Sequence, residues 1–215
     1  MPKLRVHNFG ITVDGYASGV DQTRERPFGD IEPRLLHEWM FATRFGREMM
    51  GDDGGSEGVD NLFALAGDVN VGATIMGRNM FGQILGEWED GWTGWWGPNP
   101  PYHHPVFVLT KDPHPSIPME GGTTFHFVPD GIEAALERAF EAAGGQDVRV
   151  GGGASTVQQY LRARLVDELH IVIAPILAGG GERLFDHLDG GPVGYEVVEQ
   201  VSTGAVTHVR IVQTG

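Results

Sequence analysis

The sequence predicts an α/β fold in which a mixed, mostly parallel sheet is flanked by helices and extended by a C-terminal antiparallel hairpin. In the middle of the chain, short apolar runs typical of strands alternate with helical segments, which favours parallel pairing through right-handed crossovers. Near the C-terminus, the segment 195–212 contains two strand-like runs around Thr203 and Gly204, a pattern that indicates a hairpin at a sheet edge.

Each expected element rests on its own local pattern. Pro33 opens a predicted helix over 33–50, because proline is tolerated in the first helical turn. The helix predicted over 131–145 is amphipathic and ends at two glycines. Further helices are predicted over 59–67 and 155–165. The predicted strands lie within 4–15, 69–78, 106–110, 123–128, 148–150, 167–177 and the hairpin 195–212.

Length and composition predict a single domain spanning residues 1–215. No long polar linker divides the chain, and 40% of its residues are hydrophobic, which is enough for a substantial core. The formal net charge is −14, from 15 Lys and Arg against 29 Asp and Glu. A surface this acidic repels nucleic acid and anionic lipid. Such a surface is still compatible with a small anionic ligand, because the electric field of distant surface charges is screened over about 8 Å in physiological salt.

The chain contains no cysteine, which excludes disulfides, thiolate metal sites and a cysteine nucleophile. No two histidines have the i,i+4 spacing of a helical metal site, so we expect no metal. The N-terminal segment lacks the apolar core of a secretory signal, and no apolar run is long enough to span a membrane. We therefore expect a cytoplasmic protein that makes no membrane contact.

Three consecutive glycines follow a short apolar run in the stretch DVRVGGGASTV, residues 147–157. A junction of strand, glycines and helix directs backbone N–H groups and a helix N-terminus at one point, which suits a diphosphate. The dinucleotide fingerprint G-x-G-x-x-G fails here, because Thr156 occupies its third glycine position. The stretch by itself fits a phosphate site and a tight turn equally well.

Two other predicted strands end in residues suited to a phosphorylated ligand. The first ends at Gly77 and is followed by Arg78 and Asn79, and arginine binds phosphate in a bidentate manner. The second ends at Thr110 and Lys111, a hydroxyl and a cation. Ligands of open α/β sheets bind at the C-terminal ends of the strands, so the three strand ends together favour one ligand site.

Other candidate motifs and residues have weaker support. The segment 54–58 matches the serine-hydrolase pattern G-x-S-x-G around Ser56 but follows no apolar strand. Asp14 follows the first apolar segment and is either a turn residue or a carboxylate at the mouth of the sheet. Glu38 is a candidate acid on the first long helix, where a solvated position is also common. The tryptophan-rich loop 87–105 is either a lid over a flat heterocycle or a hydrophobic plug or oligomer contact.

Taken together, the segments VNVGATIMGRNMFG, PVFVLTK and VRVGGGASTVQQYLRARLVDELHIVIAPILAGGGERLF resemble the dihydrofolate reductase-like superfamily. Within this superfamily, the chain more closely resembles one branch. The proteins of that branch are similar to the C-terminal reductase domain of bifunctional riboflavin-biosynthesis deaminase/reductases. The opening ITVDGYASG resembles an Asp-Gly loop of that branch. The resemblance covers most of the chain, and it implies a dihydrofolate reductase-like sheet and an NADPH-dependent reductase.

The resemblance also implies roles for individual residues. It implies that Gly77, Arg78 and Asn79 contact the cofactor phosphates. It also implies that Thr110 and Lys111 receive the side of the adenosine that carries the 2′-phosphate. Asp14 is placed near the nicotinamide, and Glu38 lies in the region of the catalytic carboxylate of dihydrofolate reductases. One bond between the glycines is expected to be cis. The diphosphate is expected to be held by Gly151, Gly152, Gly153, Ala154, Ser155 and Thr156.

These expectations define a functional hypothesis with an alternative. The chain is expected to transfer hydride from NADPH to a small heterocyclic substrate of pterin, pyrimidine or ribosylamino type, with Asp14 assisting protonation. The alternative is a non-catalytic protein of the same fold that binds or sequesters NADPH or a heterocycle. The expected partners are a small-molecule substrate and a second copy of the chain, because the terminal hairpin would leave an edge to be covered.

Overall fold

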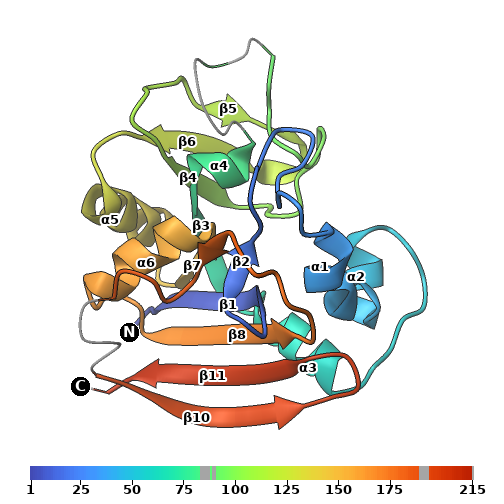
Figure 1. Ribbon diagram of the computed structural model, residues 1–215. Helices are drawn as coiled ribbons and strands as arrows, with labels where there is room; N and C mark the ends of the chain where they lie inside the picture. The colour runs from blue at the N-terminus through green and yellow to red at the C-terminus, as the bar shows by residue number, and fades with distance from the viewer. Residues whose placement is uncertain (83–87, 89–90, 189–193, 215) are drawn as a thin grey trace.

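The computed structural model describes residues 1–82, 88, 91–188 and 194–214, and Figure 1 shows their arrangement. One nine-stranded sheet, in the order β10-β11-β8-β1-β7-β3-β4-β6-β5, runs through these residues, and β2 and β9 form a separate two-stranded sheet. The strands are β1 Leu4–Thr12, β2 Tyr16–Ser18, β3 Val71–Gly77, β4 Pro105–Leu109, β5 Ile117–Pro118, β6 Thr124–Val128, β7 Asp147–Gly152, β8 Glu168–Ala174, β9 Glu182–Arg183, β10 Tyr195–Ser202 and β11 Thr207–Gln213.

The centre of the large sheet is parallel, as predicted. β1 pairs in parallel with β7 and β8, and β3 pairs in parallel with β7 and β4. β4 also pairs in parallel with β6. β10 and β11 form the predicted antiparallel hairpin, which extends the sheet beyond β8. The α/β fold predicted from alternating strands and helices is therefore confirmed.

Helices cover both faces of the sheet (Figure 1). α5 and α6 pack on the strands β3, β4 and β7, and α1 packs against β1 and β8. Ala135, Ala139 and Ala143 of α5 lie in the core, where their small side chains allow the helix to approach the sheet closely. The helices are α1 Pro33–Phe41, α2 Arg44–Met49, α3 Val59–Ala66, α4 Arg78–Phe81, α5 Ile132–Ala143 and α6 Ala154–Arg162, with a 3₁₀ turn at Glu120–Gly122.

The single helix predicted over 33–50 is wrong, because the structure divides it at Thr43. The Thr43 hydroxyl donates to the Met40 carbonyl at 2.6 Å and accepts from the Gly46 amide at 3.0 Å. Thr43 thus closes α1 and caps α2, and a hydrophobic pattern alone does not reveal such a cap. The short elements β2, β5, β9 and α4 were also absent from the prediction, because two to four residues carry too little periodicity.

An aromatic cluster forms a second core beside α4. Phe81 is fully buried and lies edge-on to Phe125 and Phe127, with ring centroids 5.0 and 5.2 Å apart. Trp88, Trp92 and Trp96 of the tryptophan-rich loop pack against this cluster. The described part of that loop therefore extends the core above β4 and β6.

A chain of buried polar groups links α3 to the strands β8 and β11. His170 Nδ1 lies 3.2 Å from the Asn8 amide, which can only donate, so Nδ1 accepts and Nε2 carries the hydrogen. His170 Nε2 then donates to His208 Nδ1 at 3.1 Å, and His208 Nε2 donates to Asp60 Oδ1 at 2.9 Å. Both histidines are fully buried and stack on Phe63. The geometry fits a neutral His170.

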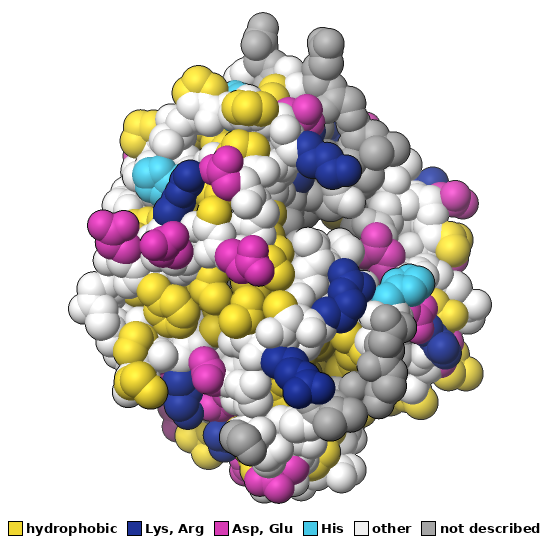
Figure 2. Space-filling model, turned by 90° about the vertical axis from the view of Figure 1, so that its left-hand side faces the viewer, with side chains coloured by type: hydrophobic (Ala, Val, Ile, Leu, Met, Phe, Trp, Pro, Cys, Tyr) yellow, Lys and Arg dark blue, Asp and Glu magenta, His cyan; other side chains and the backbone are white. Residues whose placement is uncertain are grey.

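Charged side chains are spread over the surface. Acidic residues are scattered across the face shown in Figure 2, in keeping with the net charge of −14. Among the described residues, no helix combines the length and the apolar composition required to cross a bilayer.

Candidate functional site

The carboxyl ends of the central parallel strands open into one large cavity. β3 ends at Gly77, β4 at Leu109 and β7 at Gly152, and all three residues line the cavity. Its volume is about 930 Å³. This value lies in the upper part of the range of about 300–1,000 Å³ that is typical of small-molecule sites. The sheet therefore presents a ligand site where open α/β sheets usually have one.

The glycine stretch forms the junction between β7 and α6. The peptide bond between Gly152 and Gly153 is cis, as the resemblance implied. Gly153 is the N-cap of α6, and the first turn of that helix contains no acidic side chain. The helix N-terminus consequently presents partially positive N–H groups to the cavity without a carboxylate of its own to neutralise them. This arrangement suits a diphosphate.

The ends of β3 and of the glycine stretch approach each other closely. A Cβ atom at position 77 would collide with the hydroxyl of Thr156, which is almost fully buried. Glycine at position 77 thus allows the first turn of α6 to lie against the end of β3. Two of the three strand ends that were predicted to hold phosphate are therefore side by side.

Arg78 follows β3 and lies at the same end of the cavity. Its guanidinium contacts the Asp112 carboxylate and lies over the Trp88 ring, 4.2 Å from the centroid. The Arg78 side chain is 13% exposed, whereas that of Asp112 is 59% exposed. The cation is thereby fixed beside the strand ends, with Lys111 exposed nearby on the cavity wall.

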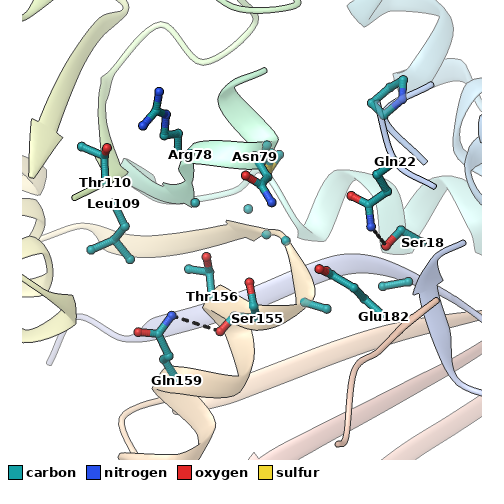
Figure 3. Close-up of a pocket in the computed structure, with 18 of the residues that line it drawn as sticks. Ser18, Gln22, Arg78, Asn79, Leu109, Thr110, Ser155, Thr156, Gln159 and Glu182 are labelled. Carbon is teal, nitrogen blue, oxygen red and sulfur yellow. Dashed lines mark hydrogen bonds between the residues drawn. The ribbon is translucent and has the colours of Figure 1, made fainter. Parts of the chain in front are cut away.

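The structure brings together every residue that was predicted to bind the cofactor. All of them line the same cavity, and Figure 3 shows Arg78, Asn79, Thr110, Ser155 and Thr156 around it. Their roles in binding stay predictions. The set is Gly77, Arg78, Asn79, Thr110, Lys111, Gly151, Gly152, Gly153, Ala154, Ser155 and Thr156.

Neither of the two predicted acids lies among the described residues that line the cavity. Glu38 is exposed on α1. Asp14 accepts hydrogen bonds from the Thr12 hydroxyl at 2.5 Å and from the Ala178 and Gly179 amides at 3.1 and 2.7 Å. These bonds, that of Thr12 first, lower the pKa of Asp14 to about 2. Asp14 therefore anchors the loop after β8 as a carboxylate, and a catalytic role for either acid stays a prediction.

Glu182, which was not singled out from the sequence, does line the cavity. It begins β9 and lies opposite Ser18 of β2 in the two-stranded sheet. Glu182 is exposed at the cavity wall, and partial desolvation there raises the pKa of its carboxyl group from its ordinary value. A raised pKa makes a carboxyl group more readily protonated, which suits it to proton transfer. The signal in the sequence was its position directly after the glycines 179–181, in the loop that Asp14 anchors.

The remaining wall of the cavity is aromatic and polar. Phe28, His37, Trp95 and Trp96 line it. The described part of the tryptophan-rich loop thus supplies a cavity wall and packs against the aromatic core, which fits both predicted alternatives, a cover over a flat ligand and a hydrophobic plug. Residues 87, 89 and 90 of that loop lie outside the described part.

Ser56 has no place in this site. It lies in the exposed loop between α2 and α3, and its amide donates to the Ala42 carbonyl at 2.9 Å. It follows no strand and opens no helix, so the context that a serine-hydrolase nucleophile requires is missing.

The family model of the RibD C-terminal domain matches residues 2–204. The chain belongs to the RibD C-terminal domain family. This membership supports an oxidoreductase related to the reductases of riboflavin biosynthesis. No curated protein shows significant sequence similarity to the chain.

Solved structures share the fold. A protein from Shewanella sp. PV-4 that is named for riboflavin biosynthesis has a TM-score of 0.62 and 22% identity, over 100% of both chains. A pyrimidine reductase-like protein from Corynebacterium diphtheriae has a TM-score of 0.53 and 14% identity, over 100% of this chain and 92% of that one. A deaminase/reductase from Thermotoga maritima has a TM-score of 0.55 and 13% identity, over 99% of this chain and 56% of that one.

Proposed function

We propose that this RibD C-terminal domain protein is an NADPH-dependent reductase that transfers hydride to a small heterocyclic substrate of pterin, pyrimidine or ribosylamino type. The observation that carries the proposal is the convergence of the eleven predicted cofactor residues on one cavity. Three strand ends and a helix N-terminus provide the donors and cations that a dinucleotide phosphate requires.

The residues of the cavity fit NADPH in composition and in charge. The N-terminus of α6 and the stretch Gly151–Thr156 would hold the diphosphate, because backbone N–H groups and hydroxyls gather there. Arg78 and Lys111 would hold the remaining phosphate charge. When bound, NADPH supplies the hydride for reduction of a C=N or C=O bond.

This chain would contribute orientation, exclusion of water and a proton. Reduction of a C=N bond adds the hydride to carbon and a proton to nitrogen. We assign the transfer of that proton to Glu182, because its carboxyl group lines the cavity and partial desolvation raises its pKa. Trp95 and Trp96 would cover the reacting rings and limit the access of water.

Two measurements test the function. We expect NADPH at millimolar concentration to raise the thermal unfolding temperature, because a ligand present at 100 times its Kd stabilises the folded state by about 2.7 kcal/mol. We also expect loss of the reduced-nicotinamide absorbance with at least one member of a heterocycle panel. Protection without turnover would instead favour the non-catalytic alternative, and no protection would contradict the proposal.

The Lys111→Ala substitution is expected to weaken NADPH binding by about tenfold or more and to leave NADH binding within about twofold. A charge-assisted bond to the 2′-phosphate contributes about 1.5–3 kcal/mol, and NADH lacks that phosphate. Isothermal titration with both nucleotides measures the difference. Lys3 is the other lysine of the chain and is exposed far from the strand ends, so Lys3→Ala is the matched control. Equal losses for NADPH and NADH would contradict the assignment.

We also propose that the chain forms a homodimer. β10 is an edge strand of the large sheet, and Val197 and Val198 on it are 59% and 49% exposed. An exposed edge with apolar side chains favours association with a second strand. Light scattering at micromolar concentration should give twice the mass of the chain, and the mass of a monomer would contradict the proposal.

A further inference from the structure

Arg78 and Asp112 form an ion pair in the cavity that the proposed function does not use. Gly77 and Leu109 are register partners at the carboxyl ends of β3 and β4. The residues that follow these strand ends therefore lie close together, and Figure 3 shows Arg78 near Thr110. Asp112 comes two residues after Thr110, and its carboxylate contacts the Arg78 guanidinium. Both partners line the cavity, so an anion of the chain itself contacts a cation of the proposed phosphate site.

The position of the Arg78 guanidinium does not depend on Asp112 alone. The guanidinium lies over the Trp88 ring, 4.2 Å from its centroid, where cation–π attraction holds it. The Arg78 side chain is only 13% exposed, so the surrounding protein also restricts its movement. A guanidinium presents a planar fork of donors that binds phosphate as well as carboxylate. Arg78 would therefore stay in place for a phosphate group when the carboxylate moves away.

The Asp112 carboxylate can leave this contact without a rearrangement of its loop. The backbone of Asp112 is fixed, because its amide donates to the Thr110 hydroxyl at 3.1 Å and its carbonyl accepts from the Trp88 indole at 3.2 Å. The Asp112 side chain, in contrast, is 59% exposed, so water can hydrate the carboxylate once it rotates away from Arg78. An ion pair with one exposed partner is weak, and a phosphate group can replace the carboxylate in it.

We propose that Asp112 sets the nucleotide selectivity of this site by competing with the 2′-phosphate of NADPH for Arg78. This inference rests on the proposed function. The 2′-phosphate must either displace the Asp112 carboxylate or share the guanidinium with it, and two anions in contact repel each other. NADH carries a hydroxyl group in place of that phosphate, so neither effect applies to it. Asp112 therefore weakens the binding of NADPH selectively and narrows the preference for NADPH that Lys111 would provide.

The Asp112→Asn substitution tests the inference, because asparagine keeps the size of the side chain and removes its charge. We expect the dissociation constant of NADPH to fall about fivefold, which is the upper contribution of an ion pair with an exposed partner, and that of NADH to change by less than about twofold. Isothermal titration of the full chain with each nucleotide measures both constants. An NADH affinity too weak to detect in either protein counts as unchanged, and thermal unfolding without nucleotide checks that the variant folds.

The matched control is Asp68→Asn. Asp68 pairs with Arg149 at 3.1 Å, and their side chains are 48% and 17% exposed, close to the values for Asp112 and Arg78. Neither Asp68 nor Arg149 is among the described residues that line the cavity. Asp68 precedes β3 and thus lies at the opposite end of that strand from the cavity. Asp68→Asn removes the same charge from the chain, and we expect both nucleotides to bind within about twofold of their normal affinity.

Three results would overturn the inference. These are unchanged or weaker NADPH binding in Asp112→Asn, equal tightening of NADPH and NADH in that variant, or the same gain for NADPH in Asp68→Asn. Equal tightening would assign the competition to the diphosphate, which both nucleotides share. Failure of NADPH to bind either the unmodified chain or Asp112→Asn would overturn the proposed function itself, which separates the two outcomes.

Discussion

Replacing Glu182 with glutamine should lower kcat by about 10²–10⁴-fold, the usual contribution of a positioned general acid. Glutamine keeps the size and the hydrogen-bonding capacity of the side chain but cannot transfer the proton. NADPH affinity should stay within about twofold, because Figure 3 shows Glu182 on the other side of the cavity from Arg78 and Thr110. Steady-state kinetics with the active heterocycle, together with a direct NADPH titration, measures both quantities.

The matched control is Glu38→Gln, which makes the same chemical change on the exposed face of α1. We expect its kcat to equal that of the unmodified chain. The two variants distinguish the acid predicted on the first helix from the acid in the cavity. A large loss of kcat in Glu38→Gln with full activity in Glu182→Gln would reverse our assignment.

Acidification should destabilise the protein well before its carboxylates titrate. Burial lowers the pKa of His170 to about 3, and it also lowers the pKa of His7 below its usual value of 6.5. In the unfolded chain both groups bind protons as the pH falls below about 6.5, whereas the folded chain excludes those protons. The free energy of unfolding therefore falls from about pH 6.5 downward, with about 2 kcal/mol lost by pH 5 through His170 alone.

Geometry explains why His170 resists protonation. A second ring proton would have to lie on Nδ1, which accepts the Asn8 amide hydrogen. Urea unfolding at several pH values between about 7.5 and 5 measures the loss of stability. The His170→Asn variant keeps an acceptor in the position of Nδ1 but does not titrate. It should be less stable at neutral pH, yet lose about 2 kcal/mol less on acidification. A pH dependence identical to that of the unmodified chain would rule out His170 as the group responsible.

The convergence of the three strand ends on one cavity could be predicted from the sequence, because their residues follow strong local patterns. A short apolar run that ends in glycine, or in threonine and lysine, predicts both a strand and the position of its carboxyl end. Residues 77–79, 110–111 and 151–156 all fall on such junctions, and parallel pairing brings the junctions to one edge. The parallel sheet could also be predicted, because apolar runs alternate with helical segments along the chain. The strands β3, β4, β7 and β8 are such short apolar runs.

The position of Glu182 in the cavity could not be predicted, because long-range contacts create it. Glu182 lies in a two-residue strand that pairs with β2, more than 160 residues earlier in the chain. Its loop is held by Asp14, which the sequence pattern presented as a catalytic candidate rather than as an anchor. The break at Thr43 depends similarly on side-chain hydrogen bonds that hydrophobic periodicity does not encode.

The most direct test of the central claim is a fluorescence titration with NADPH of the unmodified chain and two glycine variants. Trp95 and Trp96 line the cavity, so a bound nicotinamide should quench tryptophan emission in a saturable, one-to-one manner. A Cβ atom at Gly153 meets no protein atom within 4 Å, and neither does one at Gly204 in the β10–β11 hairpin. We expect Gly153→Ala to weaken NADPH binding by about tenfold or more, because its methyl group fills the diphosphate cradle, and Gly204→Ala to bind normally. Absence of saturable quenching, or equal affinity in Gly153→Ala and Gly204→Ala, would contradict an NADPH site at the strand ends.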